Sequence, residues 1–458
     1  MFYLCINLGV ETFLCMRKLI KEIIKSIYYV FPRFFRHQYI DSLHYYRNTL
    51  VKVYDKARAS CNEVDIDERN VLEVKLVEDI ECLDTDVKLL SHKVGNYSKI
   101  SSPRLYLDNI ECLRSPIESN LPDIKVASLF GVHALGGTDA VISNGNMYHN
   151  ELKCMSPIHD MKRPDIFIKN IGDKHFDYEV ITNSSRVLEG VSISLLKEHT
   201  SNYYHCMTEV IPKLIEIKSI VSDSADGVKI LIDDCMPEQC VRVIEVILAN
   251  SRVNNYLIVR VSKAELIYCE NLIYCTPIWV SLDNTTQLPS PINEFFLSVD
   301  SLIGVKDEVS RCIKYNEVSH RRTNRRIYLQ RSNSKLRKIT NIIEVERLLY
   351  KYGFDFVNTG SMSFDEQHSL FSNADLIFGV SGASFTNILF MRPGTQAVML
   401  SPSAQCTNYF IFQPLADASN VELSHLLTVP QGESSSLHED ASVNIEELET
   451  YLSERIGL

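Results

Sequence analysis

The segment that decides the fold is RIYLQRSNSKLRKITNIIEVERLLYKYGFDFV at residues 326–357, and the run LIFGV-SGAS follows at 376–384. RIYLQR is a short β-rich piece, after which Ile339 to Tyr352 carries apolar residues at helical spacing and ends at Gly353. Phe354 to Val357 reads as the next strand. Such alternation of strands and helices predicts a parallel sheet with both faces covered.

The pattern continues to residue 400. Ser363 and Glu366 have the spacing of a capping box, so a helix is expected to start there. Leu376 to Val380 is long enough for a buried strand, a helix is expected from Phe385 to Met391, and Gln396 to Leu400 reads as a final strand.

A ligand of such a sheet is expected where strands end and helices begin. The small residues Ser381 to Ser384 lie at such a point, where free backbone N–H groups can face a phosphate. Arg331 and Arg337 follow the first strand and could hold a diphosphate by charge-assisted hydrogen bonds. The alternative is that Gly382 only permits a tight turn and the arginines are solvated.

The order and spacing of these residues resemble glycosyltransferase family 61. The matching elements are Arg331, Arg337, Thr340-Asn341, Glu366-Gln367, Ala374-Asp375, Gly382-Ala383, Thr386-Asn387, Leu389-Phe390-Met391 and Pro393-Gly394. Two departures, Ser381 where the family usually has His and Met399 where it usually has an acidic residue, are expected to lie in the donor pocket. The resemblance implies donor binding by Arg331, Arg337, Asn341, Glu366, Gln367, Ser381, Gly382, Ala383 and Asn387.

A second site is expected after the apparent strand Val191 to Leu196. His205 and Glu209 are four residues apart, and so share one face of the helix that begins near Asn202. The alternative is an exposed salt-bridging pair. The family has a similar N-x-x-H segment, with Lys213 here in place of its Arg and Cys206 in place of its Trp, and this favours a role in a cleft. We expect Glu209 to be the catalytic base and His205 to orient the acceptor, although the roles could be reversed.

Further residues on the acceptor side are less distinctive. Asn202 is expected there, and Asp234 is a possible acid at a strand end, although it could instead cap the next helix. The pairs Asp65/Asp67 and Asp84/Asp86 have the D-x-D spacing of metal-dependent transferases, but neither follows a convincing buried strand. We therefore expect no metal and no cofactor, the nucleotide sugar being a substrate.

Composition bounds the class of protein. With 458 residues, 45% hydrophobic and 23% charged, the chain is expected to be globular. Residues 1–58 hold ten Lys/Arg against four Asp/Glu, and the remainder holds 37 against 54, so the body is acidic and nucleic acid is not an expected partner. Thirteen cysteines without a C-x-x-C pair suggest reduced thiols, a cytoplasmic location, and neither zinc nor disulfides.

The basic segment 17–36 mixes Lys and Arg with Leu, Ile, Tyr and Phe, and no stretch is long enough for a membrane span. The segment could lie on the anionic inner face of the cell membrane, or pack as a helix against the body.

The sequence therefore predicts an α/β protein with residues 1–60 as a basic amphipathic helical extension, 61–280 as an acceptor-side α/β domain, 281–325 as a linker, 326–436 as a nucleotide-sugar-binding α/β domain and 437–458 as a C-terminal helix. The resemblance implies a GT-B-like pair of Rossmann-like domains facing a cleft. It also implies inverting sugar transfer from a nucleotide sugar to an oligosaccharide or polysaccharide, as in capsule or surface-polysaccharide assembly. A non-catalytic sugar-binding or assembly protein and a metal-dependent GT-A transferase are the alternatives.

Overall fold

The computed structural model describes residues 70–107, 110–149, 168–170, 177–221, 227–251, 253, 255–278, 298–313, 325–331, 338–403, 407–431 and 440–456. The basic segment 17–36, the Asp65/Asp67 pair, Arg337 and most of the expected linker lie outside these residues. The chain divides into Met1–Arg69 and Asn70–Leu458, and only the second unit is described below.

The first sheet is mixed rather than purely parallel. Its path is β10 (Ile168–Asn170), β11 (Asp177–Thr182), β1 (Asn70–Leu76), β9 (Asn146–Tyr148), β8 (Val141–Ser143), β7 (Ile124–Leu135), β15 (Glu265–Cys275), β12 (Ser184–Ser194), β13 (Val228–Asp233) and β14 (Tyr256–Val261), with β2 (Val87–Lys93) also paired to β7. Only the run from β15 to β14 has the parallel α/β form. The 3-10 turn η2 (Ile80–Cys82) precedes β2.

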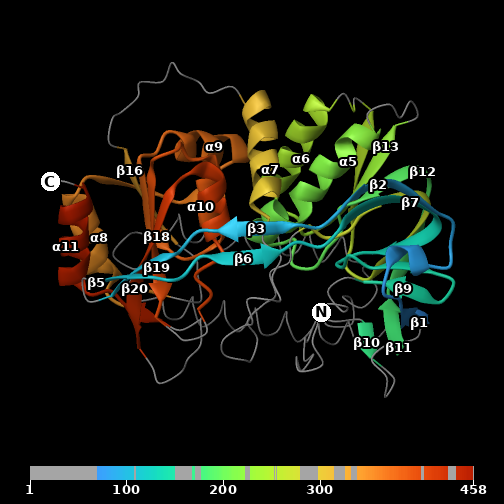
Figure 1. The fold of residues 1–458 in the computed structure, drawn as a ribbon, viewed down its shortest axis with the longest axis horizontal. Helices are drawn as coiled ribbons and strands as arrows, with labels where there is room; N and C mark the ends of the chain where they lie inside the picture. Colours follow the sequence, from blue (N-terminus) through green and yellow to red (C-terminus); the bar gives the residue numbers. More distant parts are fainter. Residues whose placement is uncertain are drawn as a thin grey trace, which may run out of the picture. The chain divides into compact units, whose positions relative to one another are not determined.

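Helices cover the parallel part of this sheet. The chain leaves β12 into α4 (Tyr203–His205), continues through a π-helical turn, η3 (Cys206–Val210), into α5 (Ile211–Val221), and later forms α6 (Glu238–Asn250) between β13 and β14. Figure 1 shows α5 and α6 next to β13. Apolar residues of α5 and α6 share a buried cluster with Ile193, Ile230 and Ile232 of the sheet, so the helices pack on this face.

The second sheet has the doubly wound order. Its path is β17 (Phe354–Val357), β16 (Arg326–Leu329), β18 (Leu376–Val380), β19 (Gln396–Pro402), β20 (Glu422–Pro430), β4 (Arg104–Leu107) and β5 (Ile110–Leu113), with β21 (Ala441–Ser442) paired to β20. All of its pairs from β17 to β4 are parallel. The order reverses between β16 and β18, which is the point where such sheets bind ligands.

Alternate residues of this sheet enter two different cores. Tyr328, Phe378 and Val398 pack with α8 (Ile342–Lys351) and α11 (Ile445–Ile456). Ile327, Ile377 and Ala397 pack instead with α9 (Phe364–Ser372), η6 (Ala383–Phe390) and α10 (Gln413–Ser419). Figure 1 shows α8 and α11 on one side of the sheet and α10 on the other. The strands are therefore apolar on both faces because both faces are covered.

A strap from the N-terminal part of the chain joins the second sheet. The antiparallel pair β3 (Tyr97–Ile100) and β6 (Ile117–Asn120) leads into β4, which lies parallel to β20. Arg104 Nη1 donates to Glu422 Oε1 at 2.6 Å, and the backbone N–H of Ser101 donates to Asp417 Oδ2 at 2.8 Å. Residues 61–280 were expected to form one α/β unit, whereas β4 and β5 of this strap belong to the second sheet.

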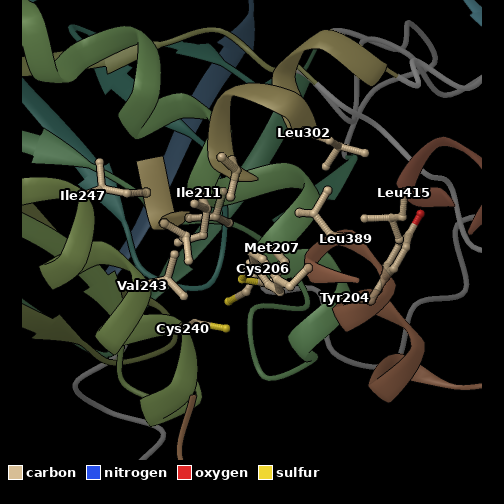
Figure 2. Close-up of a cluster of buried hydrophobic side chains, with 14 of the residues drawn as sticks. Tyr204, Cys206, Met207, Ile211, Cys240, Val243, Ile247, Leu302, Leu389 and Leu415 are labelled. Carbon is tan, nitrogen blue, oxygen red and sulfur yellow. The ribbon is translucent and has the colours of Figure 1, made fainter. Parts of the chain in front are cut away.

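One apolar cluster is shared by the helices of both sheets. Figure 2 shows Met207 and Ile211 from the η3–α5 helix, Leu302 from α7 (Val299–Cys312), Leu389 from η6 and Leu415 from α10 gathered in it. Each of these side chains is fully buried. Burying a side chain of this size contributes about 1.5–3 kcal/mol.

Local predictions for the second sheet are confirmed. β17 and β18 have the expected bounds, and the capping box of Ser363 and Glu366 starts α9. The turn at Asn144 and Gly145, both with positive φ, closes the β8–β9 hairpin, and Asn-Gly is the residue pair typical of such a turn. The segment expected to be an α-helix from Phe385 to Met391 is instead the 3-10 helix η6.

Among the described residues, no helix has both the length and the apolar character needed to cross a bilayer.

Candidate functional site

The carboxyl ends of β16 and β18 bring Arg331 to the turn at residues 381–384. Arg331 Nη1 donates to the carbonyl of Ser381 at 3.2 Å, and Ser381 N–H donates to the Leu400 carbonyl of β19 at 2.9 Å. The Arg331 side chain is exposed. The turn therefore carries an accessible guanidinium at the point where the strand order reverses.

Gly379 lets β16 and β18 approach. A Cβ atom on Gly379 would lie 3.0 Å from Leu329 Cβ and 3.2 Å from Leu329 O, which is tighter than ordinary contact. Gly382 has no comparable restriction, since its φ of 175° is extended and a Cβ would meet Arg331 Cζ at 3.6 Å. The sequence selected Gly382 and overlooked Gly379, although both belong to one glycine-bearing run.

Two residues expected to contact the donor, Asn341 and Glu366, make structural hydrogen bonds at helix ends. Asn341 begins α8, and its amide both donates to and accepts from the backbone of Val443, at 2.8 and 3.0 Å. Glu366 accepts from Ser363 N and Oγ, each at 2.8 Å, and these bonds lower the pKa of its carboxyl group. These two positions hold helix ends in place.

Gln367 and Asn387 join three elements. Asn387 Nδ2 donates to Gln367 Oε1 at 2.7 Å, and Tyr203 Oη donates to Asn387 Oδ1 at 2.7 Å. Gln367 Nε2 in turn donates to the carbonyl of Thr359 at 3.0 Å. Tyr203 lies two residues before His205, so this junction fixes the start of the helix that carries His205 relative to η6. Ala383 is the first residue of η6, and with a rise of about 2.0 Å per residue it lies about 8 Å from Asn387 along the axis of η6. The expected donor residue Ala383 is therefore close to this junction.

His205 and Glu209 form a direct pair. His205 Nδ1 lies 2.8 Å from Glu209 Oε1, and Glu209 Oε2 lies 3.2 Å from Lys197 Nζ. The Glu209 side chain is only 2% exposed, against 12% for His205. The carboxylate is thus enclosed behind the imidazole, which is nearer to solvent. The pair is not the exposed salt bridge that the sequence left open.

The helix carrying this pair is irregular because of Pro212. Proline has no N–H, and its ring would meet the carbonyl four residues earlier, that of Thr208, in a regular α-helix. The chain widens into the π-turn η3, in which Ile211 N–H donates to Cys206 O. Such turns are frequent at functional sites. Asn202 caps the helix, its Oδ1 accepting from Tyr204 N at 3.0 Å.

Asp233, the last residue of β13, is buried with its carboxylate beside Lys197 and Thr200, whereas the next residue, Asp234, is not. Asp233 accepts from Gly137 N, Lys197 N and Thr200 Oγ1 at 2.7, 3.1 and 2.9 Å, and burial raises the pKa of its carboxyl group to about 7. Asp234 is exposed, and its carboxylate accepts from Ser262 Oγ at 3.0 Å. The acceptor-side role expected of Asp234 stays a prediction; the structure places its carboxylate beside Ser262 and not beside Lys197.

Three further ionisable residues, which the sequence analysis missed, lie beside the pair. Asp139, His149 and Glu198 each offer a ligand atom within 4.8 Å of the others. However, His149 Nδ1 lies 3.2 Å from Asp139 Oδ1, and its Nε2 lies 3.0 Å from Glu198 Oε1. Because one metal ion can bind only one of these divergent nitrogens, the geometry fits an imidazole between two carboxylates better than a three-ligand metal site.

The remaining expected residues lie elsewhere. Asp84 and Asp86 are exposed in the turn before β2, and two carbonyl oxygens of this turn accept hydrogen bonds from Asn144 Nδ2 and Phe130 N. Met399 is buried in the apolar core, in register with His425 of β20, and its expected place in the donor pocket stays a prediction.

Residues 203–398 match the family model described as Glycosyltransferase 61. The matched span runs from the first residue of α4 to β19 and includes His205, Glu209, Arg331 and Asn387. No curated protein matches the chain. The match covers less than half of the chain, and over this span the chain is similar to the glycosyltransferases of that family.

Proposed function

We propose that the protein transfers a sugar from a nucleotide-sugar donor to a glycan hydroxyl with inversion, and that His205 is the base. The observation that carries this proposal is the His205–Glu209 pair at the end of β12, inside the span that matches the glycosyltransferase family. The two parallel α/β parts of the fold are compatible with a GT-B arrangement.

The pairing favours His205 over Glu209 as the base. An ionised carboxylate can only accept, so the Glu209 contact places the imidazole proton on Nδ1 and leaves the lone pair on Nε2. A buried carboxylate that orients an imidazole in this way also stabilises the imidazolium formed on proton uptake. Glu209 is too enclosed to meet the acceptor itself. This reverses the roles expected from sequence.

The reaction follows as a single displacement. His205 Nε2 takes the proton of the acceptor hydroxyl while its oxygen attacks the anomeric carbon, and the bond from that carbon to the phosphate oxygen breaks. The nucleoside diphosphate leaves with the bonding electrons. Arg331 and the backbone N–H groups at the start of η6 would stabilise the charge developing on the leaving phosphate, together with Arg337 if it converges there.

Nucleotide release from a panel of nucleotide sugars, with and without EDTA, tests the activity and its expected independence of metal. The substitution His205→Asn should lower turnover by about 1,000-fold or more. Glu209→Gln should lower it by about 100- to 10,000-fold, because Gln does not stabilise imidazolium and its amide can favour the other imidazole tautomer. Arg331→Ala should cost about 100-fold.

His92 supplies the matched control. It also pairs with a carboxylate, Asp123, at 2.8 Å, but on the exposed strand β2. The substitution His92→Asn should leave turnover unchanged. A Glu209→Gln variant that is dead beside an active His205→Asn variant would restore Glu209 as the base. Loss of activity in EDTA, recovered with Mn²⁺ or Mg²⁺, would instead favour a metal-dependent transferase.

A further inference from the structure

A line of alternating basic and acidic side chains runs inward from His205. Five contacts make it up: His205 Nδ1 to Glu209 Oε1 at 2.8 Å, Glu209 Oε2 to Lys197 Nζ at 3.2 Å, Lys197 Nζ to Glu198 Oε2 at 3.8 Å, Glu198 Oε1 to His149 Nε2 at 3.0 Å and His149 Nδ1 to Asp139 Oδ1 at 3.2 Å. We call these six residues the charge line.

The four inner residues come from loops that the sheet brings together. Asp139 precedes β8, His149 follows β9, and Lys197 and Glu198 follow β12. All four precede residue 203, so they lie outside the span that matches the family model.

The inner end of the line is closed. Asp139 is 1% exposed, and neither of its carboxylate oxygens accepts a hydrogen bond from the described residues. A proton taken up at His205 has no solvent to reach in that direction. The charge line therefore acts on His205 through its electrostatic potential rather than as a path for proton release.

Lys197 is the member that controls this potential. Its ammonium group is 1% exposed and is shared between two carboxylates, Glu209 and Glu198. In a buried setting an adjacent positive charge offsets most of the pull of a carboxylate on a third group. The positive charge on Lys197 therefore reduces the extent to which Glu209 raises the basicity of His205. The negative charge on Glu198 in turn reduces this effect of Lys197.

We propose that Lys197 is a positioning residue that sets the basicity of His205 through Glu209, a proposal that rests on His205 being the base. The other groups facing His205 are consistent with this assignment. The His199 ring, from the loop after β12, lies 5.4 Å away, and the Tyr204 ring lies 5.5 Å away. The neighbouring element η6 contains no charged residue. Among the described contacts of His205, Glu209 is the carboxylate that touches the imidazole, and Lys197 is the ammonium group that touches Glu209.

The test uses two substitutions with opposite expected signs in the full-length chain. Lys197→Met removes the offsetting charge, so the acid limb of the pH profile of kcat/KM should move up by about one pH unit. Glu198→Gln leaves Lys197 wholly to Glu209, so the same limb should move down by a few tenths of a unit or more. Lys197→Arg keeps the charge and should keep the limb near that of the wild type.

A structural role alone would lower activity at every pH without moving the limb, and that result in both variants would overturn the proposal. The titration of the His205 ring, followed by NMR with histidine labelling and assigned with His205→Asn, gives a readout that does not need turnover. The same opposite shifts in that titration support the coupling even if no sugar is transferred. If Lys197→Met does not fold, an unshifted titration in Glu198→Gln is sufficient to refute it.

Discussion

The junction at Asn387 should be worth several kcal/mol. Asn387 is fully buried, and its amide group makes both the bond from Tyr203 Oη and the bond to Gln367 Oε1, each 2.7 Å long. The substitution Asn387→Leu keeps the approximate volume but leaves a buried hydroxyl and a buried carbonyl without partners. Each such group costs about 1–3 kcal/mol, so the two together should cost the variant about 2–6 kcal/mol. Because the junction also fixes the start of α4, kcat should fall as well.

The neighbouring residue gives a matched control. Thr386 is equally buried, but its hydroxyl has no hydrogen-bond partner among the described residues. Thr386→Val keeps the shape and removes an unsatisfied polar atom, so it should be neutral or stabilising. Chemical denaturation of both variants, monitored by far-UV circular dichroism, measures the difference in their free energies of unfolding. If the free energies of unfolding of Asn387→Leu and Thr386→Val differ by less than about 0.5 kcal/mol, the junction does not hold α4 to η6.

Two further outcomes are expected for stability. Burial lowers the pKa of His425 to about 4 from its usual 6.5, so the folded protein resists protonation and its stability should fall as pH drops from 6.5 towards 4, by up to about 3 kcal/mol. His425→Phe should remove that part of the slope, and equal slopes in the two proteins would contradict the assignment. Gly379→Ala should destabilise by about 1–3 kcal/mol through contact with Leu329. Gly304 lies in α7, where an added Cβ would be 3.5 Å from Ile215, so Gly304→Ala should stabilise by up to about 1 kcal/mol. Thermal unfolding that ranks the two variants in the other order would be inconsistent with these contacts.

The second sheet was predictable because its signals are local. Apolar runs of five residues, a capping box and a glycine after an amphipathic stretch each specify one element without reference to the rest of the chain. The strap was not predictable, since Arg104 pairs with Ser424 across 320 positions of sequence and no local pattern encodes that pairing. The antiparallel half of the first sheet was missed for the same reason.

The site was predictable only in part. The spacing of His205 and Glu209 put both on one helix face, and the structure pairs them. The charge line has no such signature, because Asp139, His149 and Lys197 converge from three loops. A positive residue directly after the apolar run ending at Leu196 was the one available signal, since a lysine at the end of a buried strand needs a partner.

The residues that carried the family resemblance divide into two groups with different physical roles. Glu366, Gln367 and Asn387 hold helices together, whereas Arg331 and His205 remain able to meet a substrate. This division explains why Ser381 can replace the usual histidine without disturbing the fold. The hydrogen bonds of Ser381 to Arg331 and Leu400 use its backbone carbonyl and N–H, which any residue but proline supplies. The fold therefore does not restrict which side chain stands at position 381. Substitutions there should change the preference for the donor more than they change the stability of the fold.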